Sequence, residues 1–309
     1  MTTALITHED CLAHVTPPGH PEQVARLERV LAALEGKDLA RVSAPLAAED
    51  DLLRVHPRSH LDAIRAAAPD SGFAPLDADT WMSPGTLASA YRAVGGALRA
   101  VDLVLSGEAR NAFVAARPPG HHAERETTMG FCLFGTVAAA AKYALDHHGL
   151  GRVAVVDFDV HHGNGTQDLL EDDPRALFAS THQFPLWPGT GAAHETGPHG
   201  TILNVPLAPR SGSAEFRRAW EETVFPRVRD FRPELILVSA GFDAHRADPL
   251  AELMLETEDF AWVTERLCDL AGELCGGRLV SSMEGGYDLD ALAESAAAHV
   301  DVLMARGAA

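Results

Sequence analysis

The chain has 309 residues, of which 46% are hydrophobic, and a formal net charge of −19. This length and apolar content are sufficient for one large buried core. The excess of acidic residues argues against direct binding of nucleic acid, because phosphates attract basic surfaces, and it favours cationic partners. We find no basic, apolar leader and no apolar run of membrane length, so we expect a cytoplasmic protein without membrane contact.

Apolar runs and amphipathic stretches alternate along the chain. Strands are predicted at 111–116, 153–156, 235–240 and 278–283. Helices are predicted at 21–35, 85–105, 136–148, 213–229, 257–275 and 289–305. The alternation predicts an α/β fold with a central, mostly parallel sheet and helices on both faces. No linker or repeat divides the sequence, so we expect residues 1–309 to form a single domain.

Ionisable side chains follow the strand predicted at 153–156, namely Asp157, Asp159, His161 and His162. Side chains two residues apart share a face of a strand, so Asp159 and His161 can reach one point while His162 points elsewhere. Asp243 follows the strand at 235–240, and open α/β sheets bind ligands at the carboxyl ends of their strands. These residues predict a metal site with the three protein ligands typical of catalytic zinc. The alternative is that each acid only caps the following helix.

Two adjacent histidines, His121 and His122, lie on a proline-glycine turn after the strand at 111–116. Histidine can both accept and return a proton near neutral pH, which hydrolysis by an activated water requires. Asp157 and Asn164 are candidate acceptors that would orient the two imidazoles. The alternative is an incidental pair on the surface.

A glycine pair precedes Tyr287 at the end of the strand predicted at 278–283. Gly285 and Gly286 would let the backbone approach a ligand closely. Tyr287 would place a hydroxyl where an oxyanion can form. The alternative is a glycine turn with a packed tyrosine.

Taken together, these motifs resemble the zinc-dependent histone deacetylases and their bacterial deacetylase and acetylpolyamine amidohydrolase relatives. The resemblance rests on Gly19-His-Pro-Glu-x-x-x-Arg26, Arg117-Pro-Pro-Gly-His-His-Ala, Gly130-Phe-Cys, Asp157-x-Asp-x-His-His-Gly-Asn-Gly-Thr-Gln167, Pro188-Gly-Thr-Gly191, Ser239-Ala-Gly-Phe-Asp243 and Glu284-Gly-Gly-Tyr287. Their order along most of the chain makes coincidence improbable. Asn164 and the following Thr-Gln are similar to the class II branch, since class I members carry aspartate at that position. The resemblance implies the three-layer fold of arginases and deacetylases.

The resemblance also implies catalytic roles. Asp159, His161 and Asp243 would bind zinc, and this oxygen-rich set is compatible with Fe²⁺ as well. His122 would act as general base and then general acid, and His121, backed by Asp157, would be its electrostatic partner. Tyr287 would donate a hydrogen bond to the oxyanion. The implied reaction is hydrolysis of an N-acetyl amide.

Further residues match the substrate and cation sites of the family. Gly130, Phe131 and Trp187 would line the acetyl-lysine tunnel. Arg26 matches the arginine of an internal acetate-release cavity, although an arginine on a helix at 21–35 could equally be solvated. A structural potassium site would be formed by Asp157, Asp159, His161, Ser180 and Thr181.

The substrate is less well defined by the sequence. Leu250 occupies the position where a polyamine-selective class II enzyme carries a gatekeeper glutamate, so acetyl-lysine in proteins or peptides is favoured over acetylpolyamines. Two other interpretations remain open, a non-catalytic protein that binds acylated lysine and an arginase-like ureohydrolase with two manganese ions. The non-catalytic interpretation is disfavoured because the zinc ligands, both histidines and Tyr287 are all present. The ureohydrolase interpretation is disfavoured because the residues around His161 and Asp243 supply enough ligands for only one metal ion. The oligomeric state is not determined by the sequence.

Overall fold

The computed structural model describes residues 2–307 and contains an eight-stranded sheet. Its strands are β1 (Thr3–Thr7), β2 (Ala40–Ser43), β5 (Asn111–Val114), β6 (Val153–Asp157), β7 (Ala176–Gln183), β8 (Ile202–Leu207), β9 (Leu235–Ala240) and β10 (Leu279–Met283). They are ordered β2-β1-β5-β10-β9-β6-β7-β8, and every neighbouring pair is parallel. Two short strands, β3 (Ala74–Pro75) and β4 (Trp81–Met82), form a separate antiparallel pair. The predicted parallel sheet is confirmed.

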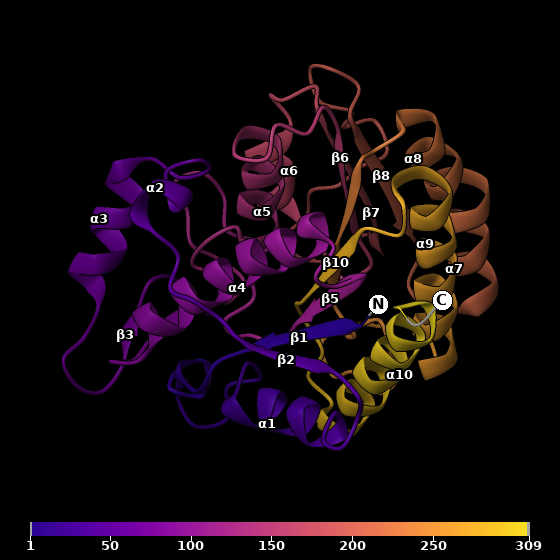
Figure 1. The fold of residues 1–309 in the computed structure, drawn as a ribbon. Coiled ribbons are helices and arrows are strands. Elements are labelled where there is room, and N and C mark those ends of the chain that lie inside the picture. The colour runs from indigo at the N-terminus through magenta and orange to yellow at the C-terminus, as the bar shows by residue number, and fades with distance from the viewer. Residues whose placement is uncertain (1, 308–309) are drawn as a thin grey trace.

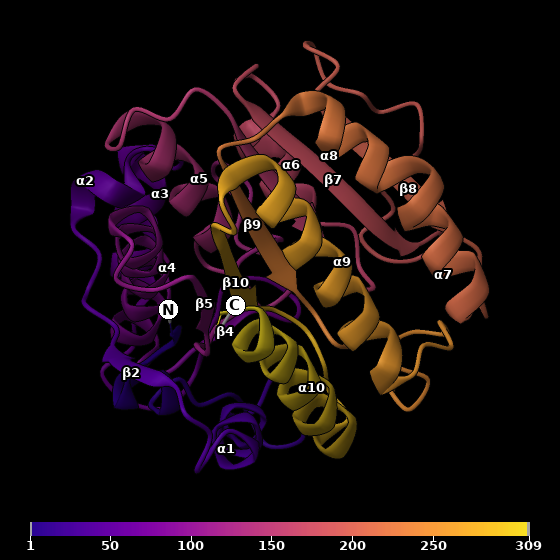
Figure 2. The same ribbon diagram turned by 45° about the vertical axis from the view of Figure 1, so that its right-hand side comes forward.

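Helices cover both faces of this sheet. They are α1 (Val24–Ala33), α2 (Glu49–Leu52), α3 (Arg58–Ala67), α4 (Thr86–Ser106), α5 (Thr136–Asp146), α6 (Asn164–Leu170), α7 (Ser213–Ala219), α8 (Phe225–Phe231), α9 (Thr257–Cys275) and α10 (Leu289–Gly307), with a short 3-10 turn at Glu9–Leu12. Helices α4 and α5 lie on one side, and α8, α9 and α10 lie on the other (Figures 1 and 2). The arrangement is the three-layer α/β architecture. Within residues 2–307, no helix is both long and apolar enough to cross a membrane.

The helix predicted at 213–229 is interrupted. Between α7 and α8, residues Trp220–Val224 form a π-helical turn, in which the Phe225 N–H donates to the Trp220 carbonyl five residues earlier. Pro226 follows directly and has no N–H to continue the regular ladder. A local widening of the helix accommodates the proline.

Four strands of the eight-stranded sheet were not predicted from apolar runs, namely β1, β2, β7 and β8, and neither was the short pair β3 and β4. Strand β7 is buried along its whole length, but its second half is the polar stretch Ser180–Gln183. Those side chains are satisfied within the fold, for example by the bond from the Trp220 indole N–H to Thr181 Oγ1 at 3.1 Å. Burial of a polar half-strand depends on partners that are remote in sequence, which an apolar pattern does not reveal.

The four central strands place the functional segments at one edge. Strands β5, β10, β9 and β6 are consecutive in the sheet, and all of their residues are buried. Because the strands are parallel, their carboxyl ends meet at the same edge. The segments that follow them carry His121 and His122, Tyr287, Asp243, and Asp159 with His161.

Candidate active site

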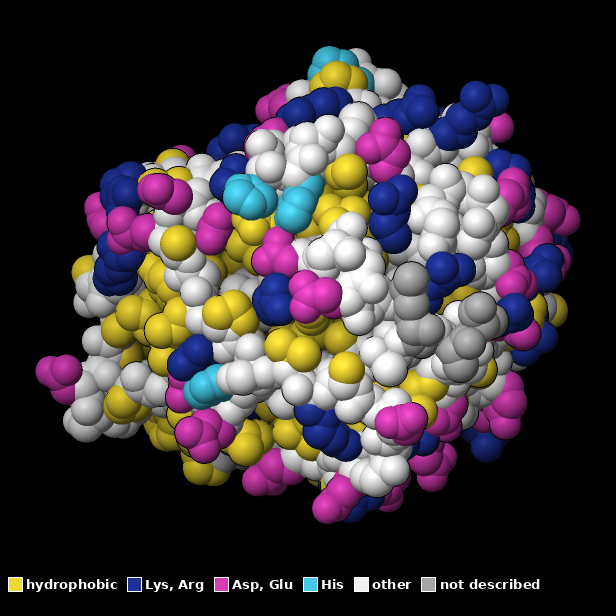
Figure 3. Space-filling view, viewed as in Figure 1, with side chains coloured by type: hydrophobic (Ala, Val, Ile, Leu, Met, Phe, Trp, Pro, Cys, Tyr) yellow, Lys and Arg dark blue, Asp and Glu magenta, His cyan; other side chains and the backbone are white. Residues whose placement is uncertain are grey.

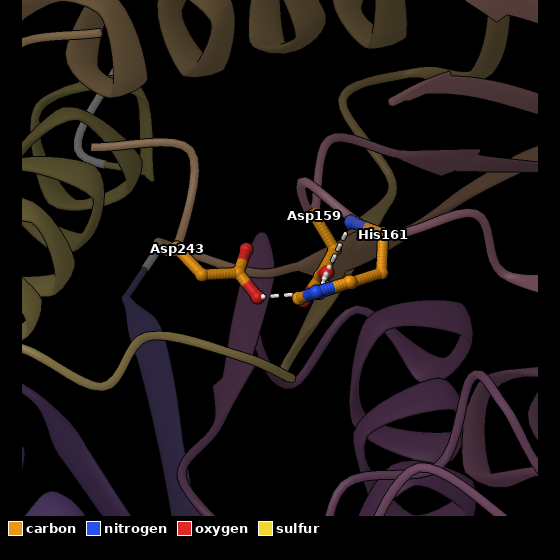
Figure 4. A group of neighbouring side chains, drawn as sticks. All are labelled: Asp159, His161 and Asp243. Atoms are coloured by element: carbon orange, nitrogen blue, oxygen red, sulfur yellow. Dashed lines mark hydrogen bonds and ion pairs between the residues drawn. The ribbon is translucent and has the colours of Figure 1, made fainter. Parts of the chain in front are cut away.

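Three side chains converge beyond strands β6 and β9. His161 Nδ1 lies 3.3 Å from Asp159 Oδ1 and 3.2 Å from Asp243 Oδ2 (Figure 4). All three residues are buried, and one ligand atom from each lies within 4.8 Å of the others. The predicted grouping of these three residues is therefore present, although Asp159 and His161 lie in a bend after β6 and not on the strand. The group could hold a metal ion.

Backbone N–H groups orient the two carboxylates. Gly285 N–H donates to Asp159 Oδ2 and Val160 N–H donates to Asp243 Oδ1, each at 2.8 Å. The approach of Gly285 is possible because it has no side chain, since a Cβ there would overlap the carboxylates of both Asp159 and Asp243. Gly241 contacts Asp159 in the same way.

The electrostatics of the cluster fit a cation. Burial lowers the pKa of His161, but hydrogen bonds to Asp159 and Asp243 outweigh it and raise the pKa to about 10. In the chain without an ion, a proton on His161 therefore supplies the positive charge that the two buried acids require. One imidazole and two carboxylates are suitable zinc ligands, and a bound ion would displace that proton.

His122 has a defined tautomer. Its Nδ1–H donates to Asn164 Oδ1 at 2.8 Å, which leaves the Nε2 lone pair free. The Asn164 amide is itself oriented, because its Nδ2–H₂ donates to Glu124 Oε1 at 2.7 Å. Burial and the positive charges of His121 and His161 hold the pKa of His122 well below its usual value. His122 is thus a neutral imidazole that can accept a proton near pH 7.

His121 differs in charge from its neighbour. Its Nδ1–H donates to Asp157 Oδ2 at 3.0 Å, and its Nε2 lies 3.7 Å from Asp159 Oδ1. Burial opposes protonation, but Asp159 and Asp157 overcome it and raise the pKa of His121 well above its usual value. The two rings lie 3.9 Å apart between centroids. His121 is thus suited to stabilise negative charge, and the neutral His122 is suited to accept a proton.

Tyr287 lines the same cavity as His122 and His161. Its ring is contacted by the Arg26 guanidinium at 4.7 Å and by Phe131 at 5.7 Å, both measured to ring centroids. Burial raises the pKa of Tyr287 well above its usual value, despite the nearby charge of Arg26. The hydroxyl therefore remains protonated and can donate a hydrogen bond.

A cavity of about 330 Å³ opens over these groups. Its lining consists of His20, Pro21, Ala78, Asp79, Trp81, His122, Gly130, Phe131, His161, Trp187, Leu250 and Tyr287. The predicted wall residues Gly130, Phe131, Trp187 and Leu250 are all part of it. Gly130 has φ +55°, and a Cβ there would meet both His122 and Trp187 at 2.5 Å. A side chain at this position would therefore obstruct the cavity.

Other predicted site residues lie below or beside the cavity. Arg26 is completely buried and donates to the carbonyl of Gly286 at 2.6 Å and to Glu22 at 3.0 Å, so the interpretation of a solvated arginine is wrong. Gly286 packs against Phe242 and Leu292 instead of lining the cavity. Gly285 lies against the carboxylates of the metal cluster.

Three of the residues predicted for potassium lie on adjacent strands, Asp157 on β6 and Ser180 and Thr181 on β7, whereas Asp159 and His161 lie in the segment after β6. Asp157 on β6 is in register with Ser180 on β7, and Thr181 follows it. The Ser180 hydroxyl bonds to His182 Nδ1 at 2.9 Å. His162 points away from the metal cluster, as its position in the sequence predicted, and bonds to Thr190 and Gln167.

Three acids around the site were not predicted from the sequence, the buried Glu284 and Asp248 and the half-buried Glu124. Glu284 Oε2 accepts from the N–H groups of Gly120 and His121, and burial raises the pKa of Glu284 to about 7. Burial and the neighbouring Asp243 raise the pKa of Asp248 likewise to about 7. Asp248 lies two residues before Leu250, which was singled out from the sequence. The Asp248-Pro249 pair is typical of a turn and was the local feature that could have drawn attention to Asp248. Glu124 had no local signal, because its partner Asn164 lies 40 residues away.

Comparison with known proteins identifies the family of the chain. A model of the histone deacetylase domain matches residues 20–303. The chain belongs to the histone deacetylase family. It is thereby a member of a family of deacetylase and amidohydrolase enzymes.

Relatives and a solved structure extend this result. The chain is 42% identical over 286 residues to the Histone deacetylase-like amidohydrolase of Pseudomonas aeruginosa, covering 88% of this chain and 74% of that protein. It is 37% identical over 327 residues to the Polyamine deacetylase HDAC10 of Homo sapiens, covering 98% of this chain and 48% of that protein. The crystal structure of the HDA15 HD domain matches with a TM-score of 0.93 at 32% identity, covering 99% of this chain and 89% of that chain.

Proposed function

We propose that this protein is a zinc-dependent deacetylase that removes acetyl groups from lysine side chains of proteins or peptides. The observation that carries the proposal is that His161, His122 and Tyr287 line one cavity, with His161 held by Asp159 and Asp243 behind it. The direction of the pKa shifts leaves His122 neutral and Tyr287 protonated. Family membership favours amide hydrolysis over a ureohydrolase reaction. Intact catalytic groups favour an enzyme over a protein that only binds acylated lysine.

The chemistry follows from the placement of these groups. Asp159, His161 and Asp243 would hold the zinc ion, which when bound would supply Lewis acidity toward the amide carbonyl and toward a water molecule. His122 Nε2 takes the proton of the water and returns it to the leaving amine, while its Nδ1–H remains bonded to Asn164. Tyr287 donates to the oxygen that becomes negative, and cationic His121 stabilises the same charge. The products are acetate and a free amine.

The cavity wall supports a long aliphatic substrate. Phe131 and Trp187 provide apolar faces for a methylene chain, and the Trp187 ring stands edge-on to His122 at 4.7 Å between centroids. Trp187 is 42% exposed, so part of the ring faces solvent at the mouth. A lysine side chain presents its acetamide at the end of four methylene groups and fits such a wall. Arg26, beneath Tyr287, would serve the release of acetate.

Two cation assignments accompany this proposal. Fe²⁺ is an alternative occupant of the zinc site because two of the three ligands are carboxylates. A structural potassium ion would be held by Asp157, Asp159, His161, Ser180 and Thr181, of which Asp157 and Ser180 are in register on adjacent strands.

Acetylpolyamines are the second candidate substrate. Asp79 lines the cavity, and its carboxylate would attract an ammonium group beyond the acetamide. One relative is named a polyamine deacetylase. Leu250 argues in the opposite direction, since it offers no charge at its position on the wall.

Acetate release tests the two candidates. The metal-loaded protein would be given an acetyl-lysine peptide and N-acetylputrescine in parallel, with Tyr287→Phe as the control. We expect turnover of the peptide and a loss in the mutant of about 10²-fold to 10³-fold in kcat. Preferential turnover of N-acetylputrescine would show that acetylpolyamines are the better substrate class. Absence of turnover of both compounds would refute deacetylation of these substrates.

A further inference from the structure

Asp248 is a buried acid beside the cavity that the deacetylation steps do not use. It is 7% exposed and lies between the metal ligand Asp243 and the wall residue Leu250. In the described part of the chain, its side-chain hydrogen-bond partners are backbone N–H groups. A buried carboxyl held in this way is costly unless its contacts organise the surrounding structure.

The two oxygens of Asp248 join separate parts of the site. Oδ2 accepts from the N–H of Tyr287 at 2.7 Å, and Oδ1 accepts from the N–H of Leu250 at 3.0 Å. Tyr287 follows strand β10, whereas Leu250 belongs to the loop after β9. One side chain therefore connects the candidate oxyanion donor with the cavity wall.

The backbone of Tyr287 needs an external anchor. Gly285 and Gly286 precede it, and Gly286 has φ +123°, a conformation that side-chain-bearing residues rarely adopt. Such a segment restrains its own conformation weakly. Arg26 and Phe131 limit the tilt of the tyrosine ring. The peptide group that joins Gly286 to Tyr287 is held at both ends, because Arg26 Nε donates to the Gly286 carbonyl at 2.6 Å and the Tyr287 N–H donates to Asp248 Oδ2 at 2.7 Å.

Leu250 depends on the same carboxyl group. Pro249 has no N–H of its own and restrains Asp248 to an extended backbone. The N–H of Leu250, two residues beyond Asp248, closes the turn on the Asp248 side chain. Leu250 is half-buried and lines the cavity. A displaced Asp248 would therefore shift the wall as well as Tyr287.

We propose that Asp248 is a positioning residue that fixes Tyr287 and Leu250 relative to each other. It thereby sets the distance from the tyrosine hydroxyl to the developing oxyanion. The inference rests on the proposed function, because its kinetic readout is turnover of the acetyl-lysine peptide. A misplacement of about 1 Å in a catalytic group costs on the order of 10²-fold in rate.

Substitution of Asp248 tests this role. Asp248→Asn keeps one acceptor oxygen, so we expect a loss of about 10-fold in kcat, whereas Asp248→Ala should lose about 100-fold. The zinc content should equal that of the wild type in both variants. Asp259→Asn is the matched control, because Asp259 is also buried and accepts a backbone N–H, that of Glu256, but lies at the start of α9. It should lower thermal stability without changing kcat.

A double-mutant cycle separates positioning from general damage. If Asp248 acts through Tyr287, adding Asp248→Asn to Tyr287→Phe should change the residual kcat by less than about twofold. The same 10-fold loss in both backgrounds would overturn the proposal. Wild-type kcat in both Asp248→Asn and Asp248→Ala would overturn it as well.

Ligand binding distinguishes failure of this inference from failure of the proposed function. Acetohydroxamic acid would be titrated calorimetrically into the zinc-loaded wild type, Asp248→Asn and Tyr287→Phe. We expect both substitutions to weaken binding by a similar factor. A wild type that binds the probe but releases no acetate refutes the proposed function alone, and an Asp248→Asn variant with wild-type affinity refutes the role of Asp248.

Discussion

Asn164 gives His122 an oriented but uncharged acceptor. The amide contributes no negative charge, and its orientation is fixed by Glu124 at 2.7 Å. In the chain without an ion, burial and the positive charges of His121 and His161 hold the pKa of His122 well below 6.5. A zinc ion that displaced the proton of His161 would keep a positive charge at that place, so the direction of the shift would be the same. Because the proposed base is the neutral imidazole, kcat/KM should fall on the acid side only below pH 6.5.

A carboxylate at position 164 should move that limb. In Asn164→Asp combined with Glu124→Gln, which removes the adjacent negative charge, the new charge favours imidazolium and raises the pKa of His122. His122 is then protonated over a wider range, so the acid limb of kcat/KM should shift upward by about one pH unit. The profile would be measured from pH 4.5 to 9, with Glu124→Gln alone as control. An unchanged or lower limb would contradict the assignment of His122 as base.

Gly285 should be required for metal binding. A methyl group in Gly285→Ala would overlap the carboxylates of Asp159 and Asp243, so the ligands must separate. We expect metal affinity to fall by at least about 10-fold, as found when groups that orient metal ligands are changed. Competition with a chelator would measure it. Gly272→Ala on α9, where a Cβ meets no atom within 4 Å, is the control and should bind metal normally.

At the scale of elements, α4 depends on close contact with the loop before α2. Gly95 on α4 faces the backbone of residues 45–47, and a Cβ there would overlap Pro45 O and Ala47 N. Gly95→Ala should lower the free energy of unfolding by about 1–3 kcal/mol, because rigid backbone on both sides cannot yield. Urea unfolding would measure the change.

A glycine-to-alanine substitution on α9 should raise the free energy of unfolding instead of lowering it. Gly272 is exposed and has space for a methyl group, so Gly272→Ala should stabilise the helix by about 0.5–1 kcal/mol. Equal effects at positions 95 and 272 would show that helix propensity, and not the contact with residues 45–47, determines the result.

Sequence periodicity predicted long helices better than strands. The helix at 257–275 was predicted with the bounds that α9 has, because its apolar positions recur over several turns. Strand β8 was missed because it is a half-buried edge strand containing Pro206. Five or six residues with mixed burial carry too little pattern to be recognised.

For the whole molecule, charge is expected to affect substrate capture. The net charge of −19 attracts cationic substrates, although acidic and basic side chains are interspersed on the face in Figure 3. We therefore expect kcat/KM for a lysine-rich acetylated peptide to fall several-fold between about 20 and 500 mM salt, since the Debye length shortens over this range. An uncharged acetylated peptide of equal length is the control. Equal salt dependence for the two peptides would rule out steering by the protein charge.

The sequence by itself predicted which chemical groups form the candidate site. Side chains two residues apart were expected to share a face, which is a local property of the chain. In the structure Asp159 and His161 lie together and His162 bonds elsewhere, although all three follow the end of β6. The catalytic roles and the potassium site carried over from the family stay predictions, as do the single domain over 1–309 and the cytoplasmic location.

The tertiary structure alone decided which groups support that chemistry. The order β5-β10-β9-β6 brings together segments that are remote in the sequence, such as Gly120 and Glu284, which are 164 residues apart. The contacts of Asp248 with Tyr287 and of Glu124 with Asn164 depend on that order. Hydrogen bonds between remote residues leave no period in the sequence, because each partner is selected by the position of the other in space.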